Sequence, residues 1–428
     1  MEMENAVIVS GVRTPIGKYL GGLKEVPAYR LGALVLEAAL RKAGLEPERV
    51  DEVILGQSYQ NGESVNIARM ALLAAGWPVQ IPGITLDRRC CSGLDAVCFG
   101  AMKIMCGQAD VVVAGGVESM SRAEFYIPGE FLKWGIGGVR DPRWGFMPRG
   151  HGSLDMWGLP LFDRIQRARV MSQPIERFGE LNSMMTWAEA AAREEGITRE
   201  AADRWAERSH RKACEAIAAG RFADEIVPVS VPGAKGKPVT IEGDEPPRAD
   251  TTLEKLAALK TVYENGICTA GNSSTENDGA AALVLVSARV ARELNIDGRS
   301  GPFADLTASA VAAADPTLTY PAVPAAVEKA LRRAAVGIRQ MDLIEIQEAF
   351  AAQVLADAKL MGLTADEMEN KLNVNGSGIS LGHPIGATGA MRLVTLLHEM
   401  SRRGAAYGLL TICGGGGQGI AAVLRRKA

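Results

Sequence analysis

The chain contains an internal repeat, and this repeat constrains the fold more than any other feature of the sequence. Residues 36–45 (LEAALRKAGL) are echoed by residues 327–336 (VEKALRRAAV), and each copy is followed by a short apolar run that carries an aspartate. Those aspartates, Asp51 and Asp342, lie 291 positions apart, the same offset as the two helical copies. Chance similarity between two alanine-rich helices would not preserve one offset through helix, loop and strand. We therefore predict two halves of the same topology.

Each half alternates short β-branched runs with amphipathic helical segments, which is the pattern of an α/β protein. Between residues 31 and 39, apolar side chains recur at the i, i+3, i+4, i+7 and i+8 positions of a helix with one buried face. Short apolar runs typical of strands buried on both faces occur at residues 7–9, 53–55, 111–113 and 283–286. The sequence therefore predicts helices layered on sheets in both halves.

The composition changes between the halves. Residues 121–265 hold five of the six tryptophans and six of the nine phenylalanines. We interpret 121–277 as an inserted loop domain whose aromatic side chains supply a small core of its own. The N-terminal half would then span 1–120 and be completed by 278–298, and the C-terminal half would span 299–428.

Composition and charge exclude several classes of partner. The 428 residues include 47 basic and 50 acidic ones, with a formal charge of −3, which argues against nucleic acid or an acidic membrane surface as a partner. No apolar run approaches the roughly 20 residues that span a bilayer, and the first residues have no basic, apolar leader, so we expect neither membrane insertion nor secretion. Seven cysteines without paired spacing fit a reducing cytoplasm and offer no metal site.

Cys90 stands at the expected start of a helix. Residues 85–97 read TLDRRCCSGLDAV, and the apolar residues that follow the two cysteines have helical spacing. A helix N-terminus lowers the pKa of a cysteine from about 8.5 toward roughly 3.5–7.5, which would favour a thiolate at Cys90. Cys91 is its rival, and these considerations alone do not separate the two. Cys98 lies on the apolar stripe and is expected to be an inert core residue.

His383 lies between a glycine and a proline, just before another predicted helix, in residues 373–389 (NVNGSGISLGHPIGATG). Glycines at such a bend let the backbone approach a ligand closely, and a neutral imidazole can accept or donate a proton. The other three histidines are expected to be solvated or structural: His151, His210 and His398.

Cys413 ends an apolar run and precedes four consecutive glycines. Such a run is entropically costly, and one reason for it is that backbone N–H groups must face a developing oxyanion. Phosphate cradling is the competing interpretation, but no Lys-Ser/Thr pair follows and the phosphate-loop spacing is absent. Two thiols and one imidazole on glycine-bent loops are suited to sulfur-based acyl transfer.

With these motifs the chain resembles the thiolase family, which comprises acetyl-CoA acetyltransferases and 3-ketoacyl-CoA thiolases. The resemblance begins at the Arg-Thr-Pro-Ile-Gly motif of residues 13–17 and runs to the C-terminus. It implies an α/β architecture, a duplicated αβαβα layered fold with mixed five-stranded sheets and an inserted loop domain. It also implies that Cys90, rather than Cys91, is the acylated nucleophile, with His383 and Cys413 as its partners.

The resemblance implies a two-step Claisen exchange on acyl-CoA, with coenzyme A as co-substrate and no permanently bound cofactor. Cys90 attacks the 3-keto carbon with help from His383, acetyl-CoA leaves as an enolate that Cys413 protonates, and CoA then removes the acyl group. The acyl-enzyme oxygen would meet the N–H groups of Cys90 and Gly415, and the enolate oxygen would meet His383 and a water. A homodimer or homotetramer is the expected assembly.

Two stretches depart from the usual thiolase pattern. Most thiolases carry Asn-Glu-Ala-Phe where this chain has Gln347-Glu-Ala-Phe350, and we predict that a local backbone adjustment lets Gln347 hold the water. Met185 and Trp187 add bulk where the family often has small residues, unless they turn into the core of the insert. This bulk points to a branched, cyclic or otherwise unusual 3-ketoacyl-CoA.

CoA is expected to bind through the insert and its junctions. Ser274 lies in a loop that resembles the pantetheine-side loop of thiolases, and Arg248 resembles an arginine near the adenine end; a solvated surface role is the alternative for each. Two other functions compete. A condensing synthase would carry a histidine in place of Cys413, and a CoA- or lipid-binding protein without catalysis would not need Cys90, His383 and Cys413 intact.

Overall fold

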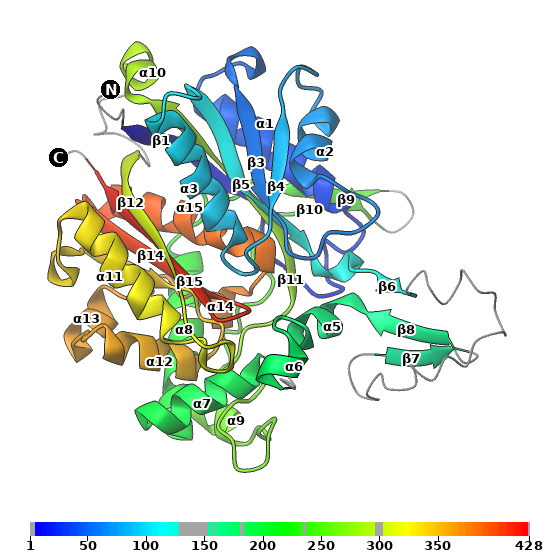
Figure 1. Ribbon diagram of the computed structural model, residues 1–428, viewed down its shortest axis with the longest axis vertical. Helices are drawn as coiled ribbons and strands as arrows, with labels where there is room; N and C mark the ends of the chain where they lie inside the picture. Colours follow the sequence, from blue (N-terminus) through cyan, green and yellow to red (C-terminus); the bar gives the residue numbers. More distant parts are fainter. Residues whose placement is uncertain are drawn as a thin grey trace.

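The structure, a computed structural model, describes residues 5–127, 153–156, 159–179, 184–233, 237–295 and 303–426. Its two halves lie side by side, and the helices of the intervening segment gather along one side of them (Figure 1). The first half comprises β1 (Ala6–Arg13), β2 (Gly17–Lys18), α1 (Ala28–Lys42), β3 (Glu52–Gly56), α2 (Ile67–Ala74), β4 (Gly83–Leu86), α3 (Ser92–Met105), β5 (Val111–Ser119) and β11 (Asn277–Ser287). The second comprises β12 (Ala304–Ala313), α11 (Ala322–Ala334), β13 (Leu343–Ile346), α12 (Ala351–Leu360), α13 (Ala365–Asn370), α14 (Gly378–Leu381), α15 (Ile385–Arg403), β14 (Tyr407–Gly414) and β15 (Gln418–Arg425).

The strand order confirms the duplication. The first half runs β4-β3-β5-β11-β1 and the second runs β13-β14-β15-β12, with the β3–β5 and β13–β14 pairs parallel and β11 and β15 antiparallel to their neighbours. Two five-stranded sheets were expected. In the described residues the second half has four strands, and a single bridge from Ile344 to Leu372 takes the place of the fifth. β1 also pairs with β12 at Val7 and Ile8, so the two sheets join edge to edge into one.

Five layers result from this pairing, as the αβαβα prediction requires. α15 packs on α3 and on β5, β11 and β14, so these two helices lie between the sheets. α1 and α2 cover the outer face of the first sheet, and α11 covers that of the second (Figure 1). The strands alternate accordingly: Leu410 and Ile412 belong to the central core, whereas Leu409 belongs to the outer core of the second half.

The central helices touch backbone to backbone because glycines stand at their crossing. A Cβ atom added at Gly389 would lie 2.4 Å from the backbone nitrogen of Leu94, and one added at Gly93 would lie 2.9 Å from that of Ala390. Neither gap accommodates a side chain without moving a helix. These two glycines therefore set the distance between the amino ends of α3 and α15, next to which Cys90 and His383 lie.

The segment between β5 and β11 holds these elements: β6 (Phe125–Tyr126), β7 (Ser153–Met156), β8 (Leu159–Asp163), α5 (Arg164–Val170), α6 (Ile175–Phe178), α7 (Met185–Glu195), α8 (Arg199–Ala218), β9 (Val229–Pro232), β10 (Pro238–Ile241) and α9 (Leu253–Ala257). The short helix α10 (Ala288–Glu293) follows β11.

The aromatic residues of this inserted segment were expected to form a separate core, and this expectation is wrong for three of them. Trp187, Trp205 and Phe222 pack into clusters with residues of the two halves, because α7 and α8 lie against α12 and α14. The tryptophans and phenylalanines at 131, 134, 144, 146 and 157, like His151, lie outside the described residues.

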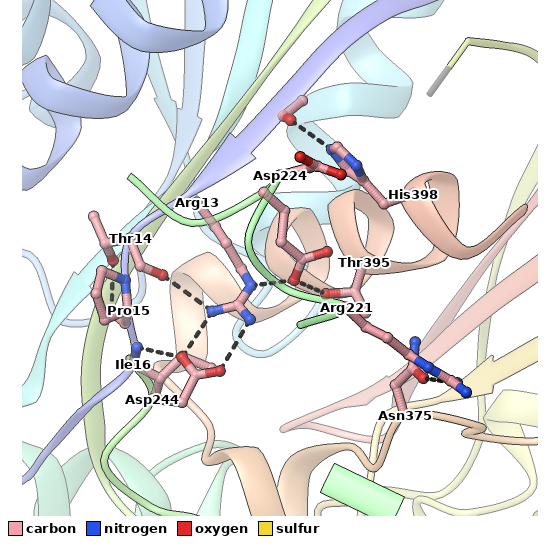
Figure 2. Close-up of polar contacts among 12 residues, drawn as sticks. Arg13, Thr14, Pro15, Ile16, Arg221, Asp224, Asp244, Asn375, Thr395 and His398 are labelled. Atoms are coloured by element: carbon pink, nitrogen blue, oxygen red, sulfur yellow. Dashed lines mark hydrogen bonds and ion pairs between the residues drawn. The ribbon is translucent and has the colours of Figure 1, made fainter. Parts of the chain in front are cut away.

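A buried ionic cluster ties the insert to both halves (Figure 2). Arg13, at the end of β1, contacts Glu225 through Nε at 2.6 Å and Asp244 through Nη1 at 2.7 Å, and all three side chains are at most 1% exposed. Thr395 of α15 donates to the same Glu225 carboxylate at 2.8 Å, and the Asp244 carboxylate also accepts from the backbone of Ile16. The two carboxylates keep the pKa of Arg13 above its ordinary value. The cluster thus fixes the two segments of the insert that lie just before β9 and just after β10.

Replacing Arg13 with methionine should lower the free energy of unfolding by about 3–5 kcal/mol, because Glu225 and Asp244 would stay buried without their cation. Chemical denaturation followed by circular dichroism measures the change. Arg49→Met is the matched control, since the side chains of Arg49 and Glu293 are 49% and 46% exposed and such pairs contribute at most about 1 kcal/mol. Equal losses in the two variants would contradict the role of the cluster.

Candidate active site

One cavity of about 710 Å³ brings together six of the seven residues that the sequence proposed for catalysis or CoA binding. Cys90, His383, Cys413 and Gly415 line it, together with Ser274 and Arg248. Gln347 is not part of the lining. The cavity lies where the amino ends of the two central helices meet the loops of the insert, so both halves and the insert contribute to its wall.

Cys90 lies two residues before the first residue of α3, as predicted, but its thiol is not acidified. Burial raises its pKa to about 11, against the lowering effects of the Arg89 cation and of a hydrogen bond from the backbone N–H of Gly415. The expectation of a depressed pKa is therefore wrong, because desolvation of the thiolate outweighs the helix terminus. At neutral pH the resting group is the thiol.

Cys90 and Cys91 are now separated by their surroundings. Cys90 is half-buried in the cavity wall, whereas Cys91 is fully buried in the central core and its Sγ lies 3.5 Å from the carbonyl oxygen of Ile412. Cys98 is likewise a core residue, as its place on the apolar stripe predicted. Only the first of the three thiols faces the cavity.

The tautomer of His383 follows from its hydrogen bonds. Its Nδ1 lies 2.7 Å from Oγ1 of Thr388, and that hydroxyl donates its single proton to the carbonyl oxygen of Pro384 at 2.8 Å. The hydroxyl must then accept from Nδ1–H, which leaves Nε2 unprotonated. Burial, with the nearby cations of Arg392 and Arg169, lowers the pKa of His383 to about 3, so the imidazole is neutral and Nε2 is a proton acceptor.

The glycine run after Cys413 forms the turn of a hairpin. β14 ends at Gly414 and β15 begins at Gln418, and Gly416 and Gly417 have φ angles of +80° and +78°, which side-chain-bearing residues rarely adopt. This turn aims the N–H of Gly415 at the sulfur of Cys90. Burial and the neighbouring Cys90 hold the pKa of Cys413 well above its ordinary value, so this second thiol is protonated and can act as an acid.

Gln347 is fully buried and does not line the cavity. Its Oε1 accepts from Nε of Arg392 at 3.1 Å, and Nη2 of the same arginine donates to the carbonyl oxygen of Gly382 at 2.7 Å. An arginine can only donate, so the amide orientation is fixed. Nε2 of Gln347 is left with no hydrogen-bond partner among the described residues.

The two residues expected to contact CoA lie at the cavity, as do several that sequence reasoning missed. Ser274 donates its backbone N–H to the carbonyl oxygen of Ala349, and Arg248, which is exposed, donates its own to Nδ1 of His210. His210 and His398 are buried and hydrogen-bonded, so they are structural rather than solvated. Further lining residues are Lys18, Tyr19, Met120, Arg169, Met184, Met185, Trp187, Ser273, Glu276 and Phe350.

Met185 and Trp187, flagged in the sequence for their bulk, add to the cavity wall and do not turn into a core within the insert. Both line the cavity, and the ring of Trp187 also packs edge-on against Phe350 with 5.3 Å between centroids. Arg169 and Glu276 had no recognisable signal, because a charged residue in a short helix or a loop is normally solvated. Their place in the wall became apparent only from the folded chain.

The described part of the chain lacks two kinds of feature. None of its helices is long and apolar enough to cross a membrane. Within the same residues, no group of three or more histidine, cysteine or acidic side chains is arranged to hold a metal ion.

Comparison with known proteins identifies the family. The family described as "Thiolase, N-terminal domain" matches residues 6–289, and "Thiolase, C-terminal domain" matches residues 300–426. The chain is 43% identical to acetyl-CoA acetyltransferase of Pseudomonas aeruginosa over 99% of its length and 100% of that protein. It is 39% identical to beta-ketoadipyl-CoA thiolase of Acinetobacter baylyi over 99% of its length and 100% of that protein. The crystal structure of acetyl-CoA acetyltransferase from Bacillus anthracis superposes with a TM-score of 0.87, at 39% identity and with 100% of both chains covered. The chain belongs to the thiolase family.

Proposed function

We propose that the protein is an acyltransferase that cleaves a 3-ketoacyl-CoA with coenzyme A, giving acetyl-CoA and a shortened acyl-CoA, or catalyses the reverse condensation. The observation that carries this proposal is the meeting of Cys90, His383, Cys413 and Gly415 in one cavity. Family membership supports it, and the thiol at Cys413 does not favour a condensing synthase.

The first step transfers a proton between two neutral groups. Cys90 is a thiol and Nε2 of His383 is unprotonated, so the imidazole takes the thiol proton as the sulfur attacks the 3-keto carbon. The C2–C3 bond then breaks, its electron pair remains on C2 of the departing acetyl-CoA enolate, and Cys413 protonates that carbon. The CoA thiol next gives its proton to the Cys413 thiolate as its sulfur attacks the acyl group on Cys90. The C–S bond to Cys90 breaks, and the departing sulfur takes its proton back from His383.

Charge on oxygen is stabilised at two places in this scheme. The oxygen bound to the acyl carbon would meet the N–H groups of Cys90 and Gly415, since the latter already points at the sulfur. The enolate oxygen would meet Nε2–H of His383, once protonated, and a water. We assign that water to Gln347, because a buried amide donor without a partner costs about 1–3 kcal/mol and a water relieves this cost.

Coenzyme A would lie along Ser274, with its phosphates or nucleotide toward the exposed guanidinium of Arg248.

Residues 121–277 are proposed as the inserted loop domain that carries these contacts. The N-terminal half would span 1–120 and be completed by 278–298, and the C-terminal half would span 299–428. A homodimer or homotetramer in the cytoplasm is the proposed state, and the free cysteines of the structure are compatible with a reducing compartment.

Incubation with CoA and a panel of 3-ketoacyl-CoAs should release acetyl-CoA, measured by mass spectrometry, and the intact protein should gain one acyl group. Peptide mapping should place that group on Cys90. Cys90→Ala should abolish both signals, whereas Cys91→Ala, the matched control, removes a thiol that does not face the cavity and should retain them. An adduct on Cys91 would refute the assigned nucleophile.

Alkylation of Cys90 by iodoacetamide should accelerate about tenfold per pH unit from pH 7 to 10. The raised pKa of about 11 keeps the thiol neutral below that pH, and the reagent reacts with the thiolate. The rate is read from the peptide that contains Cys90. A plateau reached below pH 8 would instead indicate a preformed thiolate–imidazolium pair.

Gln347→Glu should lower kcat by about 100-fold, the scale of losing one oriented donor at a developing charge. Glutamate keeps an acceptor for Arg392 but replaces the Nε2 donor with an oxygen. Steady-state kinetics measures the loss, and an unchanged melting temperature shows that the fold is kept. Undiminished activity in Gln347→Ala would remove this residue from the mechanism.

A further inference from the structure

An ion pair lies in the wall of the active-site cavity. Nη2 of Arg169 is 2.7 Å from Oε1 of Glu276, and each side chain retains 25% exposure. Both residues line the cavity with Cys90 and His383. Glu276 immediately precedes β11 and its backbone forms a bridge with that of His383, so the carboxylate is attached to the strand segment beside the catalytic imidazole.

The pair lies at the reacting end of the cavity. The positive charge of Arg169 lowers the pKa of Cys90 and also that of His383, whereas the charge of Arg248 acts on His210. Geometry agrees with this: Arg169 lines the same cavity as Cys90 and pairs with Glu276, whose backbone lies beside that of His383. The Tyr59 hydroxyl, which is buried, forms a further hydrogen bond with the guanidinium and fixes its position.

The pair is poorly matched to an aliphatic acyl chain. Much of the cavity wall is apolar, including Met120, Met184 and Phe350, although Lys18, Tyr19 and Thr275 also line it. A saturated chain bound here would strip water from both charges and return no hydrogen bond, which is a costly way to bury an ion pair. An acyl chain with a polar group at this depth would replace the lost water.

We propose, on the basis of the acyltransferase function above, that the acyl chain of the substrate carries a hydroxyl group that binds to the Arg169–Glu276 pair. A hydroxyl is both donor and acceptor, so its oxygen accepts from the guanidinium while its proton goes to the carboxylate. A carboxylate on the chain fits less well, because Glu276 already neutralises Arg169 and would repel it. The substrate class is thus a hydroxylated 3-ketoacyl-CoA.

Three probes of equal chain length test this on the unmodified protein: 3-oxohexanoyl-CoA, 6-hydroxy-3-oxohexanoyl-CoA and 3-oxoadipyl-CoA, which end in methyl, hydroxyl and carboxylate. The hydroxyl probe should show kcat/KM about 10- to 100-fold above the methyl probe, the range expected for hydrogen bonds to charged groups. A methyl or carboxylate probe that performs as well or better would overturn the proposal. No acetyl-CoA from any probe, or from acetoacetyl-CoA, would overturn the acyltransferase function itself.

A double variant tests whether the Arg169–Glu276 pair recognises the hydroxyl group of the substrate or only stabilises the fold. Arg169→Met with Glu276→Leu removes both charges together, so neither is left buried alone, and the hydroxyl-to-methyl ratio of kcat/KM should fall to about one. Arg49→Met with Glu293→Leu removes an exposed pair and should keep the ratio of the unmodified protein. A ratio that persists in the first variant would show that the pair is merely structural.

Discussion

The approach of α3 to α15 is the contact on which the site depends. Gly93 and Gly389 let the two helices meet at backbone distance, and Gly116 of β5 does the same against the carbonyl oxygen of Gly386, from which an added Cβ would be 2.2 Å away. The nucleophile belongs to one half of the duplication and the imidazole to the other. A methyl group at any of these glycines would separate the halves at the point where their chemistry converges.

This close packing also explains the charge state of the site. A helix terminus acidifies a thiol where water can reach the thiolate, but here burial dominates and raises the pKa of Cys90 to about 11 while lowering that of His383 to about 3. Both groups are therefore neutral until substrate arrives. Negative charge develops on the substrate oxygen only during bond making and breaking. The backbone N–H groups that would stabilise it are already oriented, so the protein needs little reorganisation during the reaction.

The sequence predicted what depends on periodicity and local bends. Repeated offsets gave the paired topology, glycine-rich motifs pointed to His383 and Cys413, and the family resemblance selected Cys90 over Cys91; all three line the cavity. It could not predict how neighbouring residues would be solvated. The pKa of Cys90 was misjudged for that reason, and Gln347 was expected at the water site without any indication that Arg392 would bind its amide.

Contacts between side chains far apart in the sequence could not be predicted either. Nothing in the local sequence distinguishes Arg169 and Glu276 from ordinary surface charges, because their pairing depends on residues 107 positions apart meeting in the folded chain. Trp205 was assigned to a core within the insert for a similar reason, yet its indole N–H donates to Glu348 of the second half at 3.0 Å. The amino-acid composition shows that a segment is rich in aromatic residues. It does not show which part of the protein those residues will pack against.

The position of β11 has a consequence for how the chain is made. This strand lies between β1 and β5 in the first sheet, yet it begins at Asn277, after the whole insert has been synthesised. Until the ribosome has passed it, β1 and β5 have no partner in the middle of their sheet and present open edges, a state prone to misassociation. The nucleophile is thus made early on an unfinished scaffold, and the imidazole and second thiol emerge only after that scaffold can close.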